Sequence, residues 1–177
     1  MFWSQSESTS PLRDKLAGAL IGLARATEGN EHAISDSTSS AMIEGLFILK
    51  NEPFDDEKLL VTMKKVEVEK QKLVPDCFLC ACPCGRTNDY DLALLWHSDE
   101  DIRSLKLSIL SGICEIATYI YRAFALGHKD ESIYKFLYKA LFSIGTEDWG
   151  TEKLLPIVQE VNEVNLKYME ISSNLSK

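Results

Sequence analysis

Apolar residues recur at spacings of three and four along most of the chain, which is the pattern of amphipathic α-helices. The first helix is expected to begin at Pro11, because proline suits the first helical position and Ser10 before it is a good capping residue. It is expected to end near Gly29, since glycine tolerates the left-handed turn that closes many helices. The apolar stripe of this helix consists of Leu12, Leu16, Leu20 and Leu23.

Two more helices are predicted in the first half of the chain. One carries Met42 and Leu46 and stops before Asn51, and the next runs from about Asp56 to Leu73. Phe54 before the capping Asp55 suggests a hydrophobic staple at the start of the third helix, and the mixed charges over 64–70 indicate a solvated face. The residues of the third helix that we expect to point inward are Leu59, Leu60, Met63 and Val66.

The second half of the chain repeats this plan. Asp101 is expected to cap a long helix that ends near Gly127, and Asp130 is expected to start the next one. A last helix carries Leu154, Leu155, Val158, Val161 and Met169. Pro156 is expected in its first turn, where a missing N–H matters little.

The two halves also share sequence. Residues 46–60 align without a gap onto residues 141–155, and the tetrapeptide Glu-Lys-Leu-Leu occurs at both 57–60 and 152–155. No segment shows sustained strand alternation. We therefore predict an all-α fold of two tandem three-helix bundles related by internal duplication: a first bundle over 1–74, a cysteine-rich linker over 75–97 and a second bundle over 98–177.

Composition narrows the possible partners. The 177 residues carry a formal net charge of -8, so nucleic acid and anionic membrane surfaces are poor partners. No apolar run reaches the roughly 20 residues that span a bilayer, and Met1 to Ser10 do not resemble a signal peptide. The expected location is the cytoplasm.

Four of the five cysteines, Cys77, Cys80, Cys82 and Cys84, fall within eight residues of the predicted linker. Thiolates this close together can satisfy one soft metal centre, and a Cys-x-x-Cys pair places two sulfurs on one side of a tight turn. All four cysteines are candidate ligands of an iron–sulfur cluster, with zinc or copper as the alternative. The clustered cysteines thus predict metal or redox chemistry in the linker.

Other interpretations of these cysteines stay open. Three of them could bind a metal whose shell is completed by His97 or by a second chain, although a capping or solvent-facing histidine is the simpler interpretation of His97. The cysteines could also be reduced thiols without a metal, or form a disulfide. Cys114, between Ile113 and Ile116 on a predicted helix, is interpreted as a small core residue.

Several motifs resemble those of a known family. The segments 99–105 (Asp-Glu-Asp-Ile-Arg-Ser-Leu), 123–127 (Ala-Phe-Ala-Leu-Gly) and 139–141 (Lys-Ala-Leu), together with those around Glu44 and Phe54, resemble the helical domain of hydroxylamine reductases. These are also called hybrid-cluster or prismane proteins and are related to carbon monoxide dehydrogenases. The resemblance implies a helical domain built of two tandem three-helix bundles.

The chain also departs from that family. Trp3 and Ser6 stand where the family has the cysteines of an amino-terminal iron–sulfur site, and the sequence shows no counterpart of the two α/β domains that hold the family's hybrid cluster. The resemblance therefore implies the fold but not the reductase activity, and no catalytic residue is carried over.

Two functions follow as hypotheses. The first is a small metal-binding or redox protein that holds its centre at the linker cysteines and exchanges electrons with a redox partner protein. The second is a helical interaction module without a metal, in which the bundles mediate contacts such as those of a homodimer.

Overall fold

The computed structural model describes residues 11–50, 56–73, 99–125, 131–146 and 149–175, and these residues are helical with short connections. The first helix, α1 (Pro11–Thr27), is followed by Gly29 with a φ of 80°. A 3-10 turn, η1 (Glu31–Ala33), leads into α2 (Asp36–Lys50), and α3 is Asp56–Leu73. The helices predicted in the first half, including the start at Pro11 and the glycine turn, are confirmed.

In the second half, the described residues form two long helices and a shorter one. These are α5 (Glu100–Ala125), α6 (Glu131–Ile144) and α7 (Thr151–Leu175). No strand occurs in any of the described ranges, so the predicted all-α class is confirmed.

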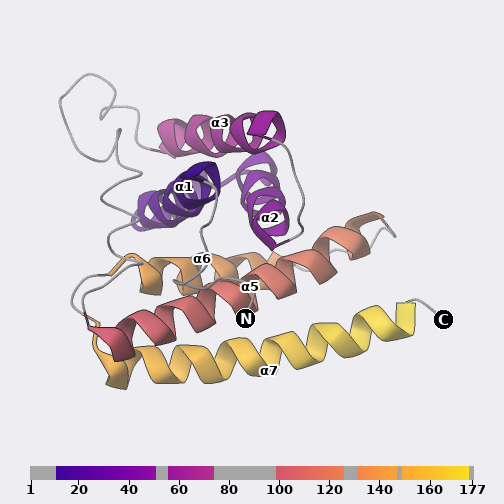
Figure 1. The fold of residues 1–177 in the computed structure, drawn as a ribbon. Helices are drawn as coiled ribbons and strands as arrows, with labels where there is room; N and C mark the ends of the chain where they lie inside the picture. Colours follow the sequence, from indigo (N-terminus) through magenta and orange to yellow (C-terminus); the bar gives the residue numbers. More distant parts are fainter. Residues whose placement is uncertain (1–10, 51–55, 74–98, 126–130, 147–148, 176–177) are drawn as a thin grey trace.

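The helices of the described residues form two groups of three that share one core (Figure 1). Helices α1, α2 and α3 contact one another, while α5 packs along α7 and also contacts α6. The groups meet where α2 lies on α5 and α1 lies on α6. At the first of these contacts the rings of Phe47 and Tyr121 stack, with centroids 4.3 Å apart. Because apolar burial continues across both contacts, the two groups stabilise each other.

Positions that the sequence repeat pairs have matching environments. Leu59 and Leu154 are buried, at 4% and 0% exposure, whereas the next residues, Leu60 and Leu155, are 39% and 48% exposed. The predicted duplication pairs α1 with α5 and α2 with α6, and under it the α2–α5 and α1–α6 contacts are equivalent. The origin of the two groups by duplication stays a prediction, as do its exact domain limits.

Three local predictions are wrong. The cap of α5 is Asp99, whose Oδ1 accepts the backbone N–H groups of Asp101 and Ile102 at 2.9 and 3.2 Å. Pro156 is the sixth residue of α7, in the second turn, because the helix begins at Thr151. Leu60 is largely exposed, since Leu59 takes the inward position on α3. Predictions on Ser10, Phe54, Asp55, Gly127 and Asp130 fall outside the described residues.

Candidate functional site

The four linker cysteines and His97 lie in residues 74–98, outside the described part of the chain. The two helices that bound this segment are described. Leu73, the last residue of α3, is buried at 4% exposure, and Asp99 caps the first turn of α5. The chain therefore enters and leaves the cysteine segment at two points fixed to the helical core.

Cys114 lies in the core, as predicted. Its side chain is fully buried on α5 and is a free thiol. Burial raises the pKa of Cys114 far above that of an ordinary thiol, although the positive charges of Lys50 and Arg13 act in the opposite direction. A thiol kept neutral in this way is a poor nucleophile and a poor metal ligand.

A buried carboxylate, which sequence analysis missed, lies between α2 and α3. Glu69 is 6% exposed, and its Oε1 accepts the hydroxyl groups of Ser37 at 2.9 Å and Thr38 at 3.1 Å. Its Oε2 lies 2.7 Å from Nζ of Lys72. Burial alone would raise the pKa of Glu69, but the hydrogen bonds from Lys72, Ser37 and Thr38 and the charge of Lys72 outweigh burial and lower it. The prediction that the run 64–70 is a solvated face is therefore wrong at Glu69.

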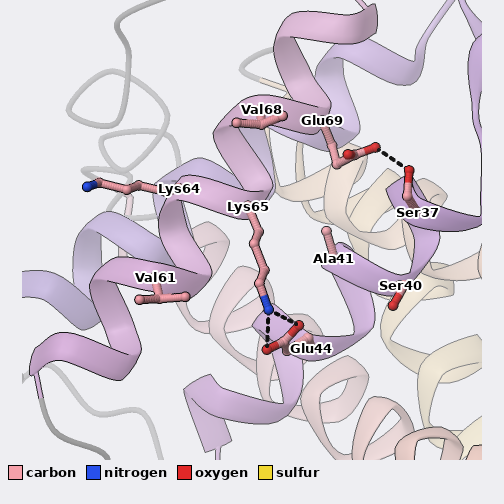
Figure 2. A pocket seen from close by; sticks show the side chains of 9 residues that line it. All are labelled: Ser37, Ser40, Ala41, Glu44, Val61, Lys64, Lys65, Val68 and Glu69. Carbon is pink, nitrogen blue, oxygen red and sulfur yellow. Dashed lines mark hydrogen bonds and ion pairs between the residues drawn. The ribbon is translucent and has the colours of Figure 1, made fainter.

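The groove beside Glu69 is open to solvent and has a volume of about 520 Å³ (Figure 2). On α2 its wall includes the small residues Ser40 and Ala41, and on α3 it includes Val61 and Val68. Nζ of Lys65 lies 3.3 Å from both carboxylate oxygens of Glu44 across the groove. Because the carboxylates of this groove already have cationic or hydroxyl partners, they are poorly placed to bind a further cation.

A second cleft, of about 540 Å³, separates the α1–α2 connection from α6. At its inner side Oγ of Ser39 and Oη of Tyr138 lie 3.3 Å apart, which joins the two groups of helices. Burial raises the pKa of Tyr138 to about 12, so its hydroxyl is neutral at ordinary pH. This cleft combines an aromatic helix face with a polar rim, as small-molecule sites do.

A polar network crosses the contact between the groups at the far end of α2. Nζ of Lys50 lies 3.4 Å from Oε1 of Glu115, and the amide of Asn165 donates to Oε2 of the same carboxylate at 2.6 Å. The network thus links α2, α5 and α7. Its charges are partly exposed, so it orients helices more than it stabilises them.

The outer side of α7 carries three exposed apolar residues, here called the α7 stripe. They are Leu155, Leu166 and Met169, which are 48%, 65% and 47% exposed. Their spacings of eleven and three residues place them on one side of the helix, with the exposed Gln159 and Asn162 between the two leucines. The α7 stripe is a candidate contact surface.

The described residues lack two kinds of feature. No group of three or more His, Cys, Asp or Glu side chains there could hold a metal ion. No helix among them is long and apolar enough to cross a membrane.

A family model and individual relatives both connect this chain to the same family of proteins. A sequence model of the Prismane/CO dehydrogenase family matches residues 5–177. The chain is 28% identical over 181 residues to a hydroxylamine reductase of Maridesulfovibrio salexigens, covering 94% of this chain and 34% of that protein. It is 31% identical over 180 residues to a hydroxylamine reductase of Chlorobaculum tepidum, covering 94% of this chain and 33% of that protein.

The chain thus spans about a third of the length of these curated relatives, while the relatives account for nearly all of it. The family match covers both groups of helices and the segment between them. On this match, the chain belongs to the Prismane/CO dehydrogenase family.

Proposed function

We propose that this chain is a helical prismane-family domain that holds a soft metal centre, an iron–sulfur cluster first of all, through Cys77, Cys80, Cys82 and Cys84. The observation that carries the proposal is the presence of four cysteines within eight residues. Zinc is the alternative metal, because it accepts the same thiolate ligands.

The position of the cysteine segment supports this proposal. The segment joins the buried end of α3 at Leu73 to the capped start of α5 at Asp99. A metal that binds the folded segment more tightly than the unfolded chain stabilises the folded state by the difference in binding free energy. Metal binding is therefore expected to raise the melting temperature of the chain.

The names of the relatives support a redox role. Hydroxylamine reductases, by their name, reduce hydroxylamine, and a reduction consumes electrons. Iron–sulfur clusters held by cysteines carry electrons over a wide range of potentials. In this proposal the centre passes electrons to or from a redox partner protein.

We do not expect the 177 residues alone to turn over hydroxylamine. About two thirds of the length of the matched relatives has no counterpart in this chain. Steady consumption of hydroxylamine by the purified chain, supplied with a reduced electron donor, would refute this expectation.

Cysteine substitutions test the proposed ligand set. Replacement of all four linker cysteines by serine is expected to remove the metal and its absorption bands, and to lower the melting temperature. Cys114→Ala is the matched control, because it removes the buried thiol of α5 and leaves the proposed ligands in place. Equal metal content in the quadruple variant and the control would overturn the proposed ligand set.

A second candidate function rests on a different observation, the exposed stripe of Leu155, Leu166 and Met169 on α7. In this alternative the domain is a non-catalytic interaction module, and the stripe is a contact surface of a homodimer. Leu166→Lys is expected to convert such a dimer to a monomer, as measured by sedimentation velocity. Glu163→Gln, at a neighbouring exposed position of α7, makes the same change of one unit in net charge and is the control.

A further inference from the structure

We propose that the cleft between the α1–α2 connection and α6 binds a small organic cation with a flat aromatic body. The cleft has a volume of about 540 Å³, within the range of sites that hold small molecules. It lies apart from the groove of Figure 2, which is on the α2–α3 side and is lined by different residues. The proposal does not depend on a metal in the linker.

One side of the cleft is aromatic. Tyr134, Tyr138 and Phe142 follow one another at intervals of four on α6, so they lie along one face of the helix. Ile34, which packs against the core, adds an apolar surface from the other side. The hydroxyl of Tyr138 is engaged by Ser39, so the inner end of the cleft favours an apolar ring over a charged group.

The other side of the cleft carries negative charge. Glu28, Glu31 and Asp36 line it from the α1–α2 connection and the start of α2, and all three are exposed. Backbone N–H groups of Glu31 and Gly29 hydrogen-bond to the Glu31 carboxylate and lower its pKa, so this group stays ionised.

Two lysines of α6 also line the cleft and oppose these carboxylates in part. Nζ of Lys139 already lies 3.5 Å from Oε2 of Glu160, outside the cleft lining, so its charge is largely balanced. The lining thus holds three carboxylates against Lys135 and the paired Lys139, so its net charge is negative. The overall charge of -8 adds to this preference for a cation.

Aromatic rings beside carboxylates are the chemistry that recognises organic cations. The aromatic side chains pack against the flat body of the ligand, and the carboxylates balance its positive charge. A flat ring fills the inner, aromatic end of the cleft, while an ammonium group reaches the rim where Glu28 and Glu31 lie. The same arrangement disfavours an aromatic anion, which would meet three like charges at the rim.

Three probes that share one phenylethyl body test the charge preference. They are 2-phenylethylamine, which is protonated at pH 7, the neutral 2-phenylethanol and the anion 3-phenylpropanoate. Titration into the ¹⁵N-labelled chain, followed by amide chemical shifts, should give a dissociation constant in the millimolar range or below for the amine. The alcohol should bind at least about fivefold more weakly, since it lacks the charge, and the carboxylate more weakly still.

Substitutions then locate the site. Glu28→Gln with Glu31→Gln should raise the dissociation constant of the amine about fivefold and leave that of the alcohol unchanged. The control pair Glu163→Gln with Glu170→Gln removes the same charge from exposed positions of α7 and should have little effect. Tyr134→Ala should weaken the amine and the alcohol together, because both use the aromatic side.

Equal affinities for the three probes would overturn the proposal. So would an unchanged affinity for the amine in the Glu28 and Glu31 variant, or shifts that map away from α6 and the start of α2. The amide spectra of the variants without ligand show whether the fold is intact. Loss of binding can therefore be distinguished from loss of structure.

Discussion

Gly112 of α5 and Val161 of α7 approach so closely that a Cβ atom at residue 112 would overlap with Cγ1 of Val161. Both helices are long, and they pack side by side along much of their length (Figure 1). The missing side chain of Gly112 lets the two backbones come together at this point. The α5–α7 contact is therefore sensitive to a single methyl group.

Gly112→Ala is the first prediction. In an unconstrained helix the change would stabilise by about 0.5–1 kcal/mol, because alanine is the better helix former. Here we expect a loss of about 1–3 kcal/mol in the free energy of unfolding, since the added methyl overpacks the contact. Urea unfolding followed by circular dichroism measures the change. In the background of Val161→Ala the same substitution should cost much less, and an equal cost in both backgrounds would show that the two residues do not meet.

Asp99 carries the second prediction. Asp99→Ala is expected to lower the free energy of unfolding by about 1 kcal/mol, because two backbone N–H groups of the first turn of α5 lose their acceptor. Asp99→Asn keeps a capping oxygen and should cost little. A larger loss from Asp99→Asn than from Asp99→Ala in thermal unfolding would argue against Asp99 as the cap.

Glu69 gives the third prediction, a dependence of stability on pH. Its pKa is lower in the folded chain than in an unfolded one, so the folded state favours the carboxylate. The resulting stabilisation is present above the unfolded pKa of about 4.3 and is lost as pH falls through the folded pKa. Glu69→Gln should therefore lower stability at pH 7 and by progressively less below about pH 4.

Urea unfolding from pH 7 to pH 3 measures this difference between Glu69→Gln and the original chain. Glu67→Gln, two residues away and less buried, is the control and should show a smaller dependence. A difference between the Glu69 variant and the original chain that stays constant over the range would contradict the account of the buried carboxylate.

Tyr138 supplies the fourth prediction. The chain has six tyrosines, and Tyr138 is expected to ionise with a pKa of about 12 because it is buried. The folded state therefore favours the neutral hydroxyl. This contribution to the free energy of unfolding is fully present below the unfolded pKa of about 10 and is lost as pH rises to the folded pKa of about 12. The absorbance of tyrosinate measured against pH should lose one tyrosine's share of the rise near pH 12 in Tyr138→Phe. An unchanged rise near pH 12, with the loss at lower pH instead, would contradict the burial of Tyr138.

Helix positions could be predicted from the sequence because their signals are local. Pro11, Gly29 and the apolar spacing that ends at Leu73 mark boundaries through backbone geometry and periodicity alone. Asp101 was a reasonable cap for α5 by residue type, but Asp99 is also a good cap by type. Only the position of the first turn distinguishes the two residues.

Other features depend on contacts between distant segments. Glu69 lies in a run of alternating charges, and only the approach of Ser37 and Thr38 on α2 turns it into a buried acceptor. The cleft beside α6 combines residues about a hundred positions apart in the chain, such as Ser39 and Tyr138, which no local pattern brings together. For the cysteine segment the sequence predicts metal binding from the spacing of the four cysteines. The segment lies outside the described residues, so this prediction is not tested by the structure.

The central proposal is that the linker cysteines hold a metal, and the metal content of the chain tests it most directly. The protein would be purified without oxygen, its visible spectrum recorded, and its iron, acid-labile sulfide and zinc counted per chain. The account predicts a coloured protein with iron and sulfide in near-stoichiometric amount, or a colourless one with about one zinc per chain. A colourless protein with less than about a tenth of a metal ion per chain would contradict it.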